Sequence, residues 1–187
     1  QLCNLGAYFM MILFIFRNKK WAQKFFDFSF IANVPGAFIA IIVVDVPEGM
    51  FSYWGVHYCL EHTWVFILPL LFFTFGVYSF PREKAMKHFF IGFTIYFVCC
   101  AVLGVLFNCF LYQEGSFFFN RVNYFYMFSD LILQAFPFMA FSFRPETSIV
   151  WGGYAFHPFY MVAIYLAFIL ICYVAQIMNE KFFEVAK

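Results

Sequence analysis

The sequence predicts an all-α protein, a polytopic transmembrane helical bundle with about five or six spans in this chain. Three observations predict this class. Hydrophobic residues make up 65% of the 187 residues and charged residues only 11%, whereas a water-facing surface normally needs about a quarter charged residues. The apolar runs are continuous over roughly 15 to 25 residues, the length of a membrane helix. They lack the alternation over ~10-residue segments that is typical of strands in membrane barrels.

Six apolar segments follow one another along the chain. The first, Leu2–Phe16, is shorter than the ~20 residues of a full crossing, and we expect residues 1–187 to form one transmembrane domain that lacks an upstream N-terminal helix. The fifth, Tyr124–Phe143, carries polar residues and either spans the membrane or dips in and returns; six spans are slightly favoured. The other helices are expected at Phe25–Val44, Glu61–Phe80, Phe89–Leu111 and Phe156–Met178, with His157 and Pro158 reading as a helix start.

The positions of Lys and Arg predict the orientation, because these charges resist translocation in short loops. The loops after the first and third spans should therefore face the cytoplasm, and residues 45–58, which carry no Lys or Arg, should lie outside with Tyr53 and Trp54 at the interface. His88, beside Lys87 at the cytoplasmic edge, is expected to be solvated. The cytoplasmic charges are Arg17, Lys19, Lys20 and Lys24 in the first loop, and Arg82, Lys84 and Lys87 in the second.

Charge and cysteine spacing exclude several classes of protein. The formal charge of +1 creates no field that would attract nucleic acid. The six cysteines show no CxxC spacing, so neither a zinc site nor a disulfide framework is indicated. We expect no metal and no cofactor. The expected partners are membrane lipids and, for a subunit of a complex, other membrane proteins, in a bacterial cell membrane or an organellar membrane.

In this topology several polar residues converge at one depth, near the outer ends of three helices. Polar groups inside a membrane are costly and usually face a partner or a wet cavity. Cys3 could act as a nucleophile and His62 as its base, although a membrane cysteine also packs as a small hydrophobe, and a histidine near a helix end often bonds a neighbouring helix. The residues at this depth are Cys3, Asn4, His62, Asn108 and Cys109.

Asn108, Asn123 and Asp130 could line a pocket for a polar lipid headgroup. Hydrogen bonds between helices explain these residues about as well.

The residues resemble a family pattern, that of the YwaF-like integral membrane proteins of bacteria, relatives of a eukaryotic transmembrane phospholipid acyltransferase. The resemblance covers about Gln1–Phe128. The pattern begins with Leu-Cys-Asn at the start of a helix, here residues 2–4, and continues some 59 residues later with a His that opens a helix, here His62. An Asn follows near the end of the next span, here Asn108. The last part is the loop Asn-Tyr-x-x-Met-Phe at residues 123–128. The family usually has a His two places before the Cys, where this chain has Gln1.

The resemblance implies an acyl-transfer site in which Cys3 carries the acyl group and His62 is the general base. Asn4 and Asn108 are candidates for the oxyanion site, and Asn4, Asn108 and Asn123 for contacts with the substrate. The first hypothesis is thus a membrane-embedded lipid-modifying enzyme. The alternative is a non-catalytic integral membrane subunit of a larger complex, and a small transporter ranks last because the sequence shows no internal repeat.

Overall fold

The computed structural model describes residues 2–42, 49, 51–81, 83–114, 122, 133 and 137–185, with the side chains of 2–4, 83 and 183–185 excepted. The chain divides into two compact units, one of residues 1–93 and 171–187 and the other of residues 94–170. The boundaries fall inside two long helices, α4 (Glu83–Val105) and α6 (Pro158–Val185). Each unit is described by itself.

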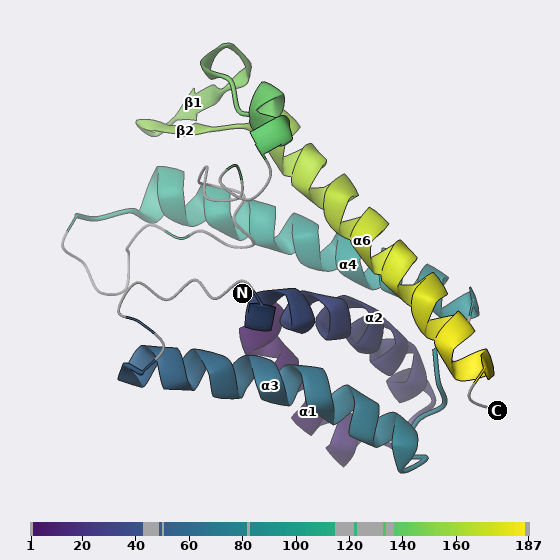
Figure 1. Ribbon diagram of the computed structural model, residues 1–187. Helices are drawn as coiled ribbons and strands as arrows, with labels where there is room; N and C mark the ends of the chain where they lie inside the picture. The colour runs from purple at the N-terminus through teal and green to yellow at the C-terminus, as the bar shows by residue number, and fades with distance from the viewer. Residues whose placement is uncertain are drawn as a thin grey trace. The chain divides into compact units, whose positions relative to one another are not determined.

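Three helices pack against one another in the first unit: α1 (Leu2–Ile15), α2 (Lys20–Ile42) and α3 (Tyr53–Thr74) (Figure 1). The helix α2 is the central one, because 61% of its membrane-length window is buried, against 22% for α3. An aromatic layer lies at one end of this unit, where the ring of Phe26 in α2 stacks on Tyr78 at a centroid distance of 4.5 Å. Such stacked pairs add to the stability that burial alone provides.

The third helix begins at Tyr53, eight residues before the predicted start at Glu61. The reason is a cap: the Ser52 side chain accepts a hydrogen bond of 3.0 Å from the Gly55 backbone N–H, which satisfies one of the free amides of the first turn. The helix ends at Thr74 rather than at the predicted Phe80. Just beyond it, Gly76 adopts a φ of 68°, a conformation that glycine adopts at little cost.

The second unit contains short elements between the two long helices. After α4 the chain continues as the π-helical turn η1 (Leu106–Leu111). Residues 137–142 and 145–147 form the 3₁₀ turns η3 and η4. An antiparallel hairpin follows, β1 (Ile149–Trp151) and β2 (Tyr154–Phe156), with Ile149 opposite Phe156.

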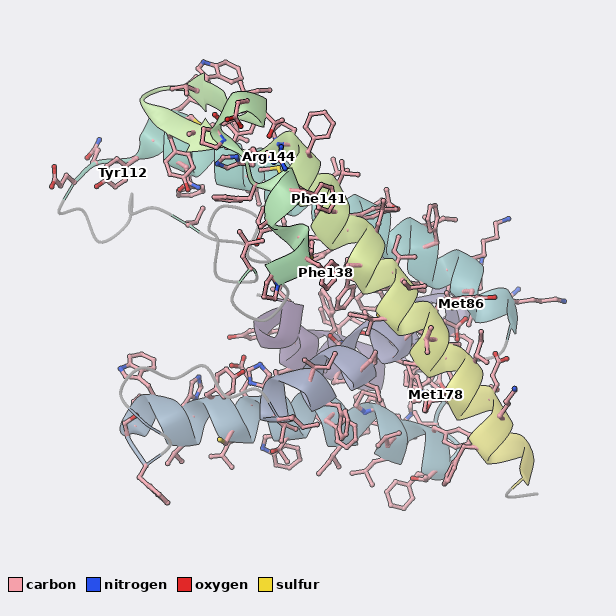
Figure 2. All side chains as sticks on the ribbon, turned by 45° about the horizontal axis from the view of Figure 1, so that its top comes forward. Met86, Tyr112, Phe138, Phe141, Arg144 and Met178 are labelled. Carbon is pink, nitrogen blue, oxygen red and sulfur yellow. The ribbon has the colours of Figure 1, made fainter. Side chains whose placement is uncertain are left out.

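The hairpin was not among the predicted elements. Its two turn residues, Gly152 and Gly153, have φ angles of 58° and 73°, and two successive residues with positive φ suit a two-residue hairpin turn. Figure 2 shows Phe138 and Phe141 of η3 beside the first turns of α6, and the ring of Phe143 stacks on that of His157 at 3.8 Å. The start of α6 at Pro158 confirms the predicted helix start.

Among the described residues, four helices are long and apolar enough to cross a membrane: Lys20–Ile42, Tyr53–Thr74, Lys84–Leu111 and Pro158–Phe182. A shorter apolar helix covers Leu5–Ile15. These helices confirm the predicted all-α bundle and define an integral membrane protein. Most of the predicted fifth span, Tyr124–Phe143, lies outside the described residues, and its last part is the 3₁₀ turn η3.

Candidate functional site

His62 is the one predicted catalytic residue whose side chain is described. It lies in α3, only 2% exposed, and its ring packs on Tyr58 with a centroid distance of 4.0 Å. The His62 Nδ1 lies 2.8 Å from the Tyr58 carbonyl oxygen. A carbonyl only accepts hydrogen bonds, so Nδ1 is the donor, and in the neutral ring the lone pair is on Nε2. This is the tautomer in which Nε2 can take a proton.

The other predicted site residues are described less fully. Cys3 and Asn4 belong to the first turn of α1, but their side chains lie outside the described set, as does Asn123. Asn108 lies in the second unit, whereas His62 lies in the first. The convergence of these residues at one depth therefore stays a prediction.

Helices α1 and α3 run in the same direction and touch closely at one point. A Cβ atom at Gly6 would stand 2.9 Å from Val65 Cγ1 and 3.2 Å from Asn33 Nδ2, so α1, α2 and α3 meet at this glycine. Two turns further along, the rings of Phe14 and Phe72 stack at 6.1 Å. Both contacts pair residues about 58 apart, which fixes the register of α1 against α3.

Two buried polar residues of α2 lie near this meeting point and were missed by the sequence reading. Asn33 is 1% exposed and donates a hydrogen bond of 3.3 Å to Ser29 Oγ, and the Asn33 Oδ1 atom is buried without a hydrogen-bond partner. Ser29 is fully buried. A buried amide oxygen without a donor costs free energy, so Asn33 is a candidate to bind a polar group beside Gly6. The sequence does carry a signal for these residues, because Ser29 and Asn33 are polar and lie one turn apart in an apolar membrane helix.

Asn108 is 2% exposed and lies in the π-helical turn η1. Its side chain bonds the backbone of Val122 twice, donating to the carbonyl oxygen and accepting from the N–H, each at 2.8 Å. These two hydrogen bonds resemble those between paired β-strands, and they hold Val122 against the turn that follows α4. These bonds favour the structural interpretation of Asn108 that the sequence left open beside the substrate-binding one.

A second polar cluster in the first unit joins α2 to α4. Asp27, 6% exposed, accepts a hydrogen bond of 2.7 Å from His88 Nδ1 and one of 2.8 Å from Gln23 Nε2. His88 keeps 30% of its side chain exposed, so it is partly solvated, and it also supplies the partner that the buried carboxylate requires. Gln23 also exchanges two bonds of 3.1 Å with the backbone of Ser79, so the cluster fixes the loop before α4.

Tyr78 lies in the loop after α3, and its pKa is clearly shifted. Its hydroxyl donates to the Leu13 carbonyl oxygen at 2.6 Å. Burial raises the pKa of Tyr78 above its ordinary 10.0, and the positive charge of Arg17 opposes this in part. The neutral phenol is therefore the form that the fold stabilises.

The described residues show no group of three or more histidine, cysteine, aspartate or glutamate side chains that could hold a metal ion. The cysteines whose side chains are described, Cys59, Cys99, Cys100, Cys109 and Cys172, are free thiols. What the site offers chemically is a buried, oriented imidazole and buried amide groups.

Comparisons with protein-family models, with curated proteins and with solved structures each give no match. The apolar helices define a membrane-embedded helical protein. The resemblance to the YwaF-like proteins stays a prediction drawn from the residues at positions 2–4, 62, 108 and 123–128.

Proposed function

We propose that this chain is a membrane-embedded lipid-modifying enzyme, which transfers or hydrolyses acyl groups through Cys3 and His62. The observation that carries the proposal is the register of α1 against α3. Gly6 meets Val65, the helices run parallel, and Cys3 and His62 each lie three residues before these contacts. Cys3 and His62 would therefore lie at about the same level, one turn of helix before this contact.

The orientation of the imidazole also supports the proposal. His62 donates through Nδ1 to the Tyr58 carbonyl, so Nε2 is left to act as a base, which is the role of the oriented histidine in Cys-His and Ser-His enzymes. The Tyr58 hydroxyl in turn donates to the Ala40 carbonyl oxygen at 3.0 Å. This bond ties α3 to α2 one turn above His62 and restricts the movement of the base.

The reaction would proceed in two steps. In the first, His62 Nε2 takes the proton of the Cys3 thiol while the sulfur attacks the ester carbonyl of a phospholipid, the ester C–O bond breaks, and the lysolipid oxygen leaves with the proton from His62. A thioester on Cys3 results. In the second, His62 removes a proton from a lysolipid hydroxyl or from water, this oxygen attacks the thioester, and the Cys3 sulfur leaves and regains its proton.

Amide groups would bind the rest of the substrate. Asn4 stays a candidate for the oxyanion site, whereas the roles of Asn108 and Asn123 stay predictions of the resemblance. Asn33 is a further candidate, because its buried Oδ1 lacks a donor and a lysolipid hydroxyl would supply one.

The test is an acyl-transfer assay on the full chain in vesicles that contain a fluorescent phospholipid and a lysolipid. We expect Cys3→Ala and His62→Gln each to lower the rate by at least about a hundredfold, the usual scale for a lost nucleophile or base. Cys59→Ala is the matched control, since Cys59 lies in the same helix within one turn of His62 and should leave the rate unchanged. Intact-mass measurement should find an acyl adduct that hydroxylamine removes and that Cys3→Ala lacks.

Equal activity in all variants, or none in the wild type, would contradict the enzyme proposal. The non-catalytic membrane subunit would then be the better interpretation, and the protein should be recovered from membranes with a stable partner.

A further inference from the structure

The turn between α1 and α2 carries a basic patch on the surface of the first unit. Four cationic side chains fall close together here, and all are exposed: Arg17, Lys19, Lys20 and Lys24. Residues 16–24 contain no acidic residue. The next acid along the chain, Asp27, is 6% exposed and already accepts hydrogen bonds from His88 and Gln23. The positive charges of the patch therefore face outward without a carboxylate on their own turn.

The local structure fixes where these charges lie. Residues 16–19 are the whole connection between the two helices. Lys20 and Lys24 stand one turn apart at the start of α2 and so share a face of that helix. The Arg17 guanidinium lies 5.3 Å from the centre of the Phe14 ring in α1, a cation–π contact. The basic patch is thus largely arranged before a ligand binds, which lowers the cost of binding.

A row of aromatic rings runs beside the two lysines of α2. Trp21 is 45% exposed, and its ring lies 5.8 Å from that of Phe16 and 6.2 Å from that of Phe25. Phe25 packs edge to face on Phe9 of α1 at 5.0 Å. Tryptophan is enriched at the membrane interface because its ring is amphipathic. The row therefore leads from the charged turn to the apolar sides of α1 and α2.

Charge and depth together select the ligand. Clusters of four or more Lys and Arg next to the end of a membrane helix attract anionic lipids, and α2 is long and apolar enough to cross the membrane. A soluble acidic partner could neutralise the lysines, but it would leave the aromatic row uncovered. A lipid covers both, because its headgroup reaches the cations while its acyl chains lie along the rings.

We propose that the basic patch binds the headgroup of an anionic phospholipid, with Lys20 and Lys24 at its phosphate and Trp21 beside the upper part of an acyl chain. Binding here needs neither Cys3 nor His62, so the patch and the proposed catalytic pair can be tested separately.

The experiment detects the lipid at Trp21 itself. Phenylalanine replaces Trp54, Trp64 and Trp151, so that Trp21 is the only tryptophan left of the four. The full chain in neutral micelles is titrated with phospholipids that carry bromine, a contact quencher of tryptophan fluorescence, near the top of one acyl chain. Brominated phosphatidylglycerol should reach half-quenching at a mole fraction at least about tenfold below that of brominated phosphatidylcholine, because each cation near an anionic surface strengthens binding about fivefold.

Salt separates the charge from the apolar contact. Raising the salt from about 0.1 M to about 1 M shortens the screening length from about 10 Å to about 3 Å. The preference for phosphatidylglycerol should then largely disappear, whereas quenching by phosphatidylcholine should persist. A preference that 1 M salt leaves intact would contradict binding through the lysines.

Two pairs of lysine variants give the matched comparison. Lys20→Gln with Lys24→Gln should reduce the preference for phosphatidylglycerol about tenfold. Lys84→Gln with Lys87→Gln removes the same charge from two exposed lysines of α4 and should change the preference by less than about twofold. Quenching by phosphatidylcholine should be the same in all variants, which shows that they are folded. Equal quenching by the two lipids in the wild type, or an equal loss in both lysine pairs, would overturn the proposal.

Discussion

The close contact at Gly6 gives the sharpest prediction of stability. In Gly6→Ala, the new Cβ would lie 2.9 Å from Val65 Cγ1 and 3.2 Å from Asn33 Nδ2, whereas carbon atoms in contact prefer about 3.5–4.0 Å. Overpacking of this kind costs about 1–3 kcal/mol, and the better helix propensity of alanine returns up to about 1 kcal/mol. We expect a net loss of about 1–2 kcal/mol, measured as the free energy of unfolding in mixed micelles titrated with a denaturing detergent.

A double-mutant cycle tests the cause. Val65→Ala removes both methyl groups that the new Cβ would meet, so the cost of Gly6→Ala should fall by at least about 1 kcal/mol in the double variant. If Gly6→Ala is neutral, or if the two costs simply add, then α1 and α3 do not touch in this register, and the argument for the catalytic pair fails with it.

Three further predictions concern the polar contacts. Asp27→Ala removes the acceptor of the His88 bond and should lower the unfolding free energy by about 1–3 kcal/mol in the same detergent titration; no loss would mean that the pair is not formed. Asn108→Ala leaves the N–H and C=O of Val122 without partners and should cost about 2–3 kcal/mol, with faster amide exchange at Val122, whereas unchanged exchange would refute the contact. Burial raises the pKa of Tyr78, so the stability that the neutral Tyr78 phenol contributes is complete below pH 10 and is lost as the pH rises through the raised pKa. In a thermal melt, Tyr78→Phe should therefore lose less stability at alkaline pH than the wild type. An equal alkaline loss in both proteins would argue against this contribution.

The helices could be predicted because long apolar runs have one dominant solution in a membrane, a helix that satisfies its own backbone. Their ends were harder. The start at Tyr53 depends on the Ser52 cap, which lies in a segment of mixed polarity that also suits an interfacial loop. The hairpin carries a readable signal, Gly152 and Gly153 between two apolar triplets, but the apolar run around it is typical of a helix start as well.

The polar contacts depend on tertiary packing, and spacing in the sequence could not reveal them. Asp27 is a charge inside an apolar run and is a candidate site by that fact alone, but its partner His88 lies 61 residues away. For the proposed catalytic pair, the residue types and the order of the helices could be read from the sequence. The register of α1 against α3, on which the pairing depends, could not, since it follows from the contact of Gly6 with Val65.

The most direct test of the proposed site is disulfide formation between Cys3 and a cysteine introduced by His62→Cys, in the full chain in membranes with the other native cysteines replaced by alanine. Gly6→Cys with Val65→Cys is the positive control, since a Cβ atom at position 6 would stand 2.9 Å from Val65 Cγ1 and the two positions are therefore in contact. Leu60→Cys, exposed by 55% on the same helix, is the control for another face. The account predicts rapid oxidation of Cys3 with position 62 and slow oxidation with position 60. Equal rates at the two positions, or no bond at position 62 while the positive control forms, would contradict it.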